Sequence, residues 1–323
     1  MNSKILVKIL AVLITLVLVV LLLNQINLGD IFTTLQNINL IYIIGGFLLY
    51  TCSYFFRAWR FHVLLNREVS TKDLFYIECV HNSVNNLLPA RTGELSYVYL
   101  LKKINNKTTG DGVATLVVAR IFDFIALISL FFIAVILVTN IPKIMLSALW
   151  IIAVFALFLL IVLVILITRG KNFVINVQKT AERLHCENNP VVNYLIRKGF
   201  ETVESLDKIQ VKKSIAGLMT SSLLIWGVNY LVVYLLMKGM NIQISILLVI
   251  LGGTFILLTT VLPIQGIAGF GTTETIWTLV FVPLGLSMDQ AIISGFCYHI
   301  VIILYFTILG LYGWITVRLK ISL

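Results

Sequence analysis

The stretch "PIQGIAGFGTTE", residues 263–274, interrupts a long run of Leu, Ile, Val and Phe with a proline, three glycines and a glutamate. Proline removes a backbone donor, and glycine adopts backbone angles closed to other residues, so a regular helix is not expected to continue through it. In lipid, broken backbone is tolerated only where protein or a wet cavity satisfies its polar groups. The stretch therefore predicts a helix that breaks at a polar site inside a membrane protein.

The composition around this stretch is that of a polytopic helical membrane protein. Hydrophobic residues make up 59% of the 323 residues and charged residues 12%, with a mean hydropathy of +1.02. Several apolar runs reach the roughly 20 residues that cross a bilayer as a helix. Because these runs lack an alternation of period two, they indicate helices rather than a β-barrel, and we predict an all-α fold.

The apolar runs predict about six full membrane spans. They lie at residues 4–24, 39–56, 111–138, 145–168, 214–237 and 290–317. If these spans alternate in direction, every Lys and Arg except Lys143 and Lys238 falls on or near the side that holds Met1. Basic residues accumulate on the cytoplasmic side, so both termini are expected in the cytoplasm and the chain in the cytoplasmic membrane. The net charge of +10 then indicates contact with anionic lipid rather than with nucleic acid.

A second interruption lies in the sequence "NSVNNLLPARTGELSYVYLL", residues 82–101. We call residues 89–94 the first break and residues 263–274 the second break. Basic flanks predict that residues 72–107 form a re-entrant hairpin entering from the cytoplasm, and the direction of the neighbouring spans predicts that residues 244–283 form one entering from outside. Two such hairpins, each between two full spans of opposite direction, predict an inverted-topology repeat with a binding site near the bilayer midplane.

The whole chain is predicted to be one integral membrane domain. Its parts are the first span with an outer loop (1–38), the first repeat (39–138), the fourth span with a cytoplasmic linker (139–212) and the second repeat (213–323). Apolar positions at helical spacing in the linker predict one or two amphipathic helices on the inner surface. This linker is either a simple connector or a docking surface.

The candidate binding residues are the break residues and the charged side chains inside the membrane, where each charge costs at least about 2.5–3.5 kcal/mol. Arginines are expected to attract a lipid phosphate, and glutamates a cationic or hydroxyl-rich headgroup. The candidates are Arg57, Arg60, Pro89, Arg91, Gly93, Glu94, Arg120, Asp123, Pro263, Gly266, Gly269, Gly271 and Glu274. Two alternatives stay open: Arg120 and Asp123, spaced i to i+3, form a structural ion pair, and Arg57 and Arg60 mark the membrane interface.

No catalytic residue, metal or cofactor is predicted. Glu78 and His81 have an ExxH spacing, but a di-metal carboxylate site needs two such motifs and two further glutamates on neighbouring helices, and the other copy, Glu182 and His185, lies in the linker. The four cysteines are scattered, and the chain has no GxxxxGK[ST] loop for nucleotide phosphates.

Four segments carry a resemblance to a known family. They are "FRAWRFHVLL" (56–65), "NNLLPARTGELSYVYLLKK" (85–103), "ARIFDFIAL" (119–127) and "PIQGIAGFGTTE" (263–274). In this order they resemble the lysylphosphatidylglycerol synthase transmembrane-region family, also called flippase-like or UPF0104. The resemblance implies translocation of phospholipids, notably aminoacylated phosphatidylglycerol. The chain stops at Leu323, so we expect no cytosolic aminoacyltransferase domain. Thr273 and Gln265 depart from the family pattern, which leaves the headgroup open.

We therefore expect a flippase-like transporter, rather than an enzyme, for an anionic or aminoacylated phospholipid or another lipid-linked headgroup. One alternative is a membrane-embedded lipid-headgroup transferase resembling a phosphatidylglycerol lysyltransferase. Another is a non-catalytic partner of a separately encoded lipid-modifying enzyme. Besides the bilayer, the candidate partners are such an enzyme and a second copy of this chain.

Overall fold

The computed structural model describes residues 17–88, 93–138, 169–184, 189–209, 211–259 and 267–322, together with single positions between 154 and 165. The described residues form helices and no strand, which confirms the all-α prediction. The helices are α2 (Leu28–Asn37), α3 (Leu40–Leu64), α4 (Thr71–Leu87), α5 (Glu94–Asn105), α6 (Thr109–Leu137), α8 (Pro190–Lys208), α9 (Val211–Gly239), α10 (Ile246–Thr259), the 3₁₀ turn η2 (Ile267–Gly269), α11 (Thr272–Phe281) and α12 (Met288–Ser322). Residues 17–23 and 169–183 are also helical.

Four of the described helices are long and apolar enough to cross a membrane, and they agree with four predicted spans. They are Leu40–Leu64 in α3, Thr109–Leu137 in α6, Ser214–Gly239 in α9 and Met288–Lys320 in α12. The predicted spans at 4–24 and 145–168 fall largely outside the described residues. The total of six spans therefore stays a prediction.

Helix α3 is longer than the sequence predicted, since it continues past residue 56 to Leu64. Its last turns bury Phe61 and Leu64 in an apolar cluster with side chains of α4, α5 and α6. Arg60 is also buried there, with 2% of its surface exposed. Arg57 and Arg60 thus lie within the helix and not at its end. Arg60 is tolerated there because Asp123 of α6 neutralises its charge.

Helix α2 replaces part of the predicted outer loop at residues 25–38. The Asn27 side chain caps this helix by accepting a hydrogen bond from the Gly29 N–H at 3.0 Å. Ile31 is buried in a cluster with Ile292 and Phe296 of α12. The helix is therefore stabilised by a contact with a distant segment, which a local reading of the sequence does not reveal.

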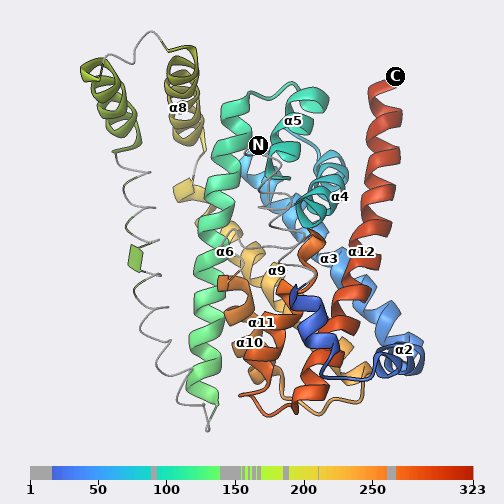
Figure 1. Ribbon diagram of the computed structural model, residues 1–323. Coiled ribbons are helices and arrows are strands. Elements are labelled where there is room, and N and C mark those ends of the chain that lie inside the picture. Colours follow the sequence, from blue (N-terminus) through green and yellow to red (C-terminus); the bar gives the residue numbers. More distant parts are fainter. Residues whose placement is uncertain are drawn as a thin grey trace, which may run out of the picture.

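The broken segments occupy opposite ends of the molecule. In Figure 1, α4 and α5 lie in the upper half, at the same end as the C-terminus and α8, and α10 and α11 lie in the lower half. Helix α4 contacts α5, and α10 contacts α11. Helix α4 also contacts the turn η2 of the other broken segment. Each pair lies in the chain between two long helices, as predicted. The re-entrant path and the inverted symmetry stay predictions.

Helices α4 and α12 approach closely because α12 carries glycine where they cross. A Cβ atom at Gly310 would lie 2.1 Å from Ser83 Oγ, and one at Gly313 would lie 2.5 Å from Cys79 Cβ. Small residues allow such approach between membrane helices. Ser83 also donates a hydrogen bond to the Phe306 carbonyl at 2.5 Å, so the first broken segment is anchored to the last helix.

The predicted linker contains two described helices, residues 169–183 and α8, and its place on the cytoplasmic side stays a prediction. Helix α8 packs on the start of α6, where the Gly110 N–H donates to Glu201 at 2.9 Å and Lys198 forms an ion pair with the same carboxylate. Partial burial opposes ionisation of Glu201, but the hydrogen bonds from Lys198 and Gly110 hold its pKa below the ordinary value. The carboxylate thus helps to dock the linker on the membrane helices.

Candidate functional site

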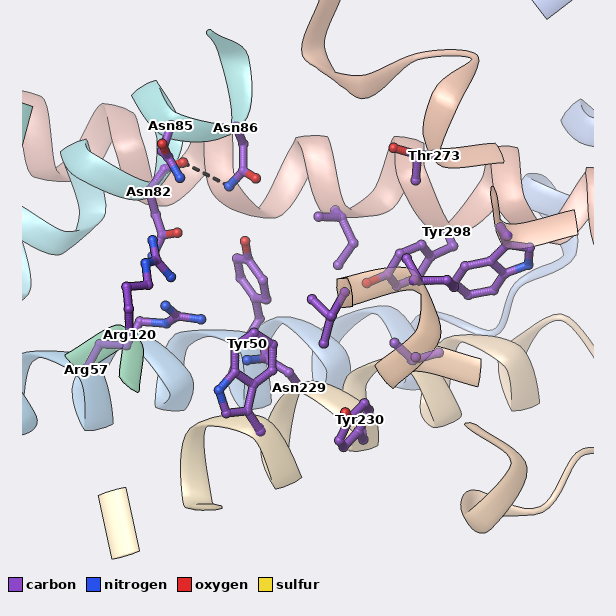
Figure 2. A pocket seen from close by; sticks show the side chains of 17 residues that line it. Tyr50, Arg57, Asn82, Asn85, Asn86, Arg120, Asn229, Tyr230, Thr273 and Tyr298 are labelled. Atoms are coloured by element: carbon purple, nitrogen blue, oxygen red, sulfur yellow. Dashed lines mark hydrogen bonds between the residues drawn. The ribbon is translucent and has the colours of Figure 1, made fainter. Parts of the chain in front are cut away.

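A cavity of about 220 Å³ lies among the long helices and both broken segments. Its walls come from α3, α4, α6, α9, α10, α11 and α12. The residues that line it are Tyr50, Arg57, Asn82, Asn85, Asn86, Arg120, Trp226, Asn229, Tyr230, Val233, Gly253, Ile256, Leu257, Thr273, Trp277, Tyr298 and Ile302. We call it the arginine cavity. Figure 2 shows Arg57 and Arg120 at one end and Thr273 and Tyr298 at the other.

Arg57 supplies a positive charge that no described carboxylate neutralises by an ion pair. Its guanidinium carbon lies 5.8 Å from the centre of the Trp226 ring, a cation–π distance. Its Nε is buried and has no hydrogen-bond partner among the described residues. A buried donor without a partner is costly, so this end of the cavity is suited to an anionic ligand.

Amide side chains cover the wall next to the arginines. Asn82, Asn85 and Asn86 are spaced i, i+3 and i+4, which places them on one face of α4. Asn86 donates to the Asn82 carbonyl at 2.8 Å. Asn82 Nδ2 and Asn85 Oδ1 are buried without a partner among the described residues. A ligand with hydroxyl or phosphate groups would satisfy them.

A buried charged cluster lies beside the arginine end of the cavity. Arg60 Nη1 donates to Asp123 Oδ1 at 2.5 Å and to Ser222 Oγ at 2.9 Å, and Trp226 Nε1 donates to Asp123 at 2.9 Å. These contacts tie α3, α6 and α9 together. Trp226 also contacts Arg57 through its ring, so the hydrogen bond to Asp123 helps to orient this part of the cavity wall.

Arg120 connects the cavity to the first break. Its Nη2 donates to Glu94 Oε1 at 2.7 Å, and Glu94 is the first residue of α5. The predicted partner Asp123 lies farther away, at 3.9 Å from Arg120 Nη1. Gly93 allows the break to close, because a Cβ there would lie 2.3 Å from the Asn85 Cα. Gly93, at the end of the first break, thus lies tightly against α4.

The second break has its own buried pair. Glu274 is fully buried, accepts from the Gly271 N–H at 2.8 Å and lies 2.6 Å from His299 Nδ1 of α12. The other ring nitrogen of His299 lies 3.0 Å from the Ala268 carbonyl oxygen. Ala268, Gly269 and Gly271 have φ values of 50°, 81° and 78°, in the left-handed region. Only Ala268, as a non-glycine residue, is strained there, and contacts with His299 and Glu274 hold this turn in place.

The structure brings only part of the predicted site together. Arg57 and Arg120 line the arginine cavity. Beside it, Glu94 forms an ion pair with Arg120, and Asp123 forms one with Arg60. Gly93, Gly269 and Gly271 shape the two breaks, and Glu274 faces His299 without lining the cavity. Pro89, Arg91, Pro263 and Gly266 lie outside the described residues. Their roles in binding stay predictions.

Several polar residues of this region were missed at the level of sequence. The asparagines of α4, Asn229 of α9 and His299 of α12 were not candidates, although the run "NSVNN" at residues 82–86 is unusually polar for a membrane helix. Glu78 is 1% exposed, lies within electrostatic reach of Arg57 and Arg60, and its Oε1 has no partner among the described residues. Within the described part of the chain, no three His, Cys, Asp or Glu side chains gather as metal ligands.

Comparison with known proteins gives the family. The model for the lysylphosphatidylglycerol synthase TM region matches residues 8–310. The chain belongs to this family. A UPF0104 membrane protein of Methanocaldococcus jannaschii is 28% identical over 202 residues, which cover 62% of this chain and 78% of that protein. No solved structure matches the chain. Together with the apolar helices, the family establishes a multi-pass membrane protein.

Proposed function

We propose that this member of the family translocates an anionic lipid, with the headgroup phosphate held at the arginine end of the cavity and the acyl chains left in the bilayer. The observation that carries the proposal is Arg57, which lines the cavity and has no ion-pair partner among the described residues. Arginine matches the geometry of phosphate oxygens through its fork of donors.

The remaining charges favour an uncharged, hydroxyl-rich headgroup beyond the phosphate over an aminoacylated one. No Asp or Glu lines the cavity among the described residues, because Asp123 faces Arg60, Glu94 faces Arg120 and Glu274 faces His299. The undescribed break residues 89–92 and 260–266 contain no Asp or Glu. A cationic headgroup would enter a cavity that already carries Arg57 and Arg120, whereas amides and aromatic rings accommodate hydroxyl groups.

Transport is favoured over headgroup transfer by the lining itself. A transferase needs a positioned acid, base or nucleophile beside the headgroup. The described lining holds Tyr and Thr hydroxyls as possible nucleophiles, but no Glu, Asp, His or Cys that would activate them. A site with strong binding groups and weak acid–base groups is suited to carrying a headgroup unchanged. Alternating access would then come from movement of one broken segment against the other, as expected for paired interrupted helices.

The experiment is a lipid-translocation assay in proteoliposomes. The purified chain is reconstituted with fluorescent phosphatidylglycerol, phosphatidylcholine or lysylphosphatidylglycerol, and movement between leaflets is followed by chemical quenching of the outer leaflet. We expect acceleration for phosphatidylglycerol and little for the lysyl lipid. Arg57→Ala should lower the rate about ten- to a hundredfold, the effect of losing a hydrogen bond to a charged group. Arg67→Ala, at an exposed position after α3, is the matched control.

Three results would count against the proposal. If no lipid moves faster than in empty vesicles, the chain is not a translocase under these conditions of membrane and headgroup. If Arg57→Ala behaves like Arg67→Ala, the phosphate is not held at this end of the cavity. If the lysyl lipid moves as fast as phosphatidylglycerol, the inference from the cavity charges is wrong.

A further inference from the structure

We infer that Glu274 and His299 form a proton-binding site, and that release of its single proton frees the turn of residues 267–271, so that lipid movement is coupled to protons. The inference rests on the proposed transport function, but the site is separate from the arginine cavity. It follows from the positions of two acceptor atoms around one imidazole ring.

The contacts of His299 fix how many protons the pair holds. The Ala268 carbonyl oxygen, 3.0 Å from Nε2, can only accept, so Nε2 must carry a hydrogen. The 2.6 Å contact between Nδ1 and Glu274 Oε1 then needs one more proton, either on Nδ1 or on the carboxyl group. In both forms the pair is neutral overall. The described conformation therefore binds one proton that a free carboxylate and a neutral imidazole would lack.

Loss of that proton would break the contact. The Nδ1 lone pair would then face a carboxylate oxygen, and a negative charge would remain on Glu274, whose side chain is 0% exposed. The charge would keep only the hydrogen bond from the Gly271 N–H. An uncompensated charge in such a place is strongly disfavoured, so the pair would separate and the carboxylate would move toward water.

Among the described residues of the packed helices, no other charge replaces the proton. Helix α10 has no ionisable residue, and Glu274 is the only one in α11. On α12 the neighbouring Tyr298 stacks on Trp277, with ring centres 4.6 Å apart. Helix α4, which touches η2, contributes Glu78 and His81, and His81 Nδ1 is engaged with the Gly93 carbonyl at 3.2 Å. The remaining charge of the first break is Arg91, outside the described residues.

Separation of the pair would be transmitted to the cavity through adjacent backbone. His299 holds Ala268, a non-glycine residue in the left-handed region, and Glu274 caps α11 through Gly271. Thr273, next to Glu274, lines the arginine cavity, and η2 touches α4 of the first broken segment. When the pair opens, the strained turn loses both constraints, and the end of the cavity opposite the arginines is the part that moves.

The first test follows the conformation directly and does not depend on transport. Thr273→Cys is introduced into a chain whose Cys52 and Cys186 are replaced by serine, and the rate of maleimide labelling, corrected for the intrinsic pH dependence of thiol reactivity, is measured from pH 5 to 9. We expect labelling to rise about tenfold or more as pH increases, the effect of losing one hydrogen bond to a charged group. Labelling that does not change with pH would overturn the inference.

Glu274→Gln is the decisive variant, because its amide can donate to His299 Nδ1 and accept from the Gly271 N–H, as the protonated carboxyl does. We expect slow labelling at every pH in this variant. Asp289→Asn, an exposed carboxylate at the start of the same α12, is the matched control and should behave like the parent. If Glu274→Gln keeps the pH response of the parent, Glu274 does not bind the proton.

The second test uses proteoliposomes with fluorescent phosphatidylglycerol and a pH difference across the membrane. We expect the gradient to drive net movement of lipid in the parent, and Glu274→Gln to lose that drive while still exchanging labelled for unlabelled lipid. Translocation that ignores the gradient would overturn the inference and leave the proposed function intact. No translocation together with pH-dependent labelling would overturn the proposed function and leave the proton site.

Discussion

The buried pair of Arg60 and Asp123 gives the sharpest prediction about stability. Arg60 donates to Asp123 at 2.5 and 3.2 Å, and both side chains are nearly inaccessible. Removing one partner of a buried ion pair costs about 3–5 kcal/mol, since the other charge is left uncompensated. Replacing both by apolar residues of similar volume is often neutral. We therefore compare Arg60→Met, Asp123→Leu and the double variant.

The two single changes should differ, because their remaining partners differ. After Arg60→Met, Asp123 keeps the hydrogen bond from Trp226 and Arg120 at 3.9 Å, an attraction of roughly 4 kcal/mol at an effective dielectric constant of about 20. After Asp123→Leu, Arg60 keeps Ser222 and forms no second ion pair among the described residues. We expect a loss of about 3 kcal/mol for Arg60→Met, about 5 kcal/mol for Asp123→Leu and about 1 kcal/mol for the double variant.

The assay is reversible unfolding in mixed micelles, in which the fraction of denaturing detergent is raised and helix content is followed by circular dichroism. All proteins are measured at one pH and one micelle concentration, so that differences in the free energy of unfolding are comparable. The reasoning fails if the double variant is as unstable as the sum of the single variants. It also fails if Arg60→Met is the less stable of the two single variants, because Arg120 would then not compensate Asp123.

Three further predictions concern the contacts that hold the broken segment and the linker. Gly93→Ala should destabilise the protein by about 1–3 kcal/mol in the same unfolding assay, because its Cβ would lie 2.3 Å from the Asn85 Cα, whereas Gly217→Ala, with open space around it, should not. Gly313→Ala should cost a similar amount, since its Cβ would lie 2.5 Å from a Cβ of α4. The lowered pKa of Glu201 means that its stabilisation of the docked linker is present at neutral pH and is lost as pH falls through that lowered value. After correction for the intrinsic pH dependence of amide exchange, the protection of α8 should therefore fall by about 1 kcal/mol in acid, and Glu201→Gln should remove that fall.

The fold was predictable from sequence where the signal is local. Long apolar runs marked α3, α6, α9 and α12, because hydrocarbon thickness sets both the length and the composition of a spanning helix. Helix α2 was not predictable, since it depends on the Asn27 cap and on burial of Ile31 against α12. The end of α3 was misplaced for a related reason: a basic residue usually marks the membrane surface, but Arg60 is neutralised by a residue 63 positions later.

The candidate site was predictable as a set of charges but not as a set of contacts. Charges inside a membrane are costly, which made Arg57, Arg120 and Asp123 candidates without any structure. The local i to i+3 spacing favoured a pair between Arg120 and Asp123, but Arg120 contacts Glu94 more closely, at 2.7 Å against 3.9 Å. Neutral asparagines give no such signal, so the amide wall of the cavity became visible only when the helices were placed together.

The two breaks, compared with each other, show a common construction that bears on the predicted repeat. In each, a glutamate in the first turn of the returning helix pairs with a nitrogen base on the long helix that follows. Glu94 pairs with Arg120 across 26 positions, and Glu274 pairs with His299 across 25. Similar spacing in the two segments is expected if both descend from one unit, as the predicted inverted repeat requires. The bases differ in one property: arginine keeps its charge at all physiological pH values, whereas histidine exchanges a proton in that range. Glu94 is thus paired with a base that stays charged, whereas the pair of Glu274 and His299 is the one that the proposed proton release would open.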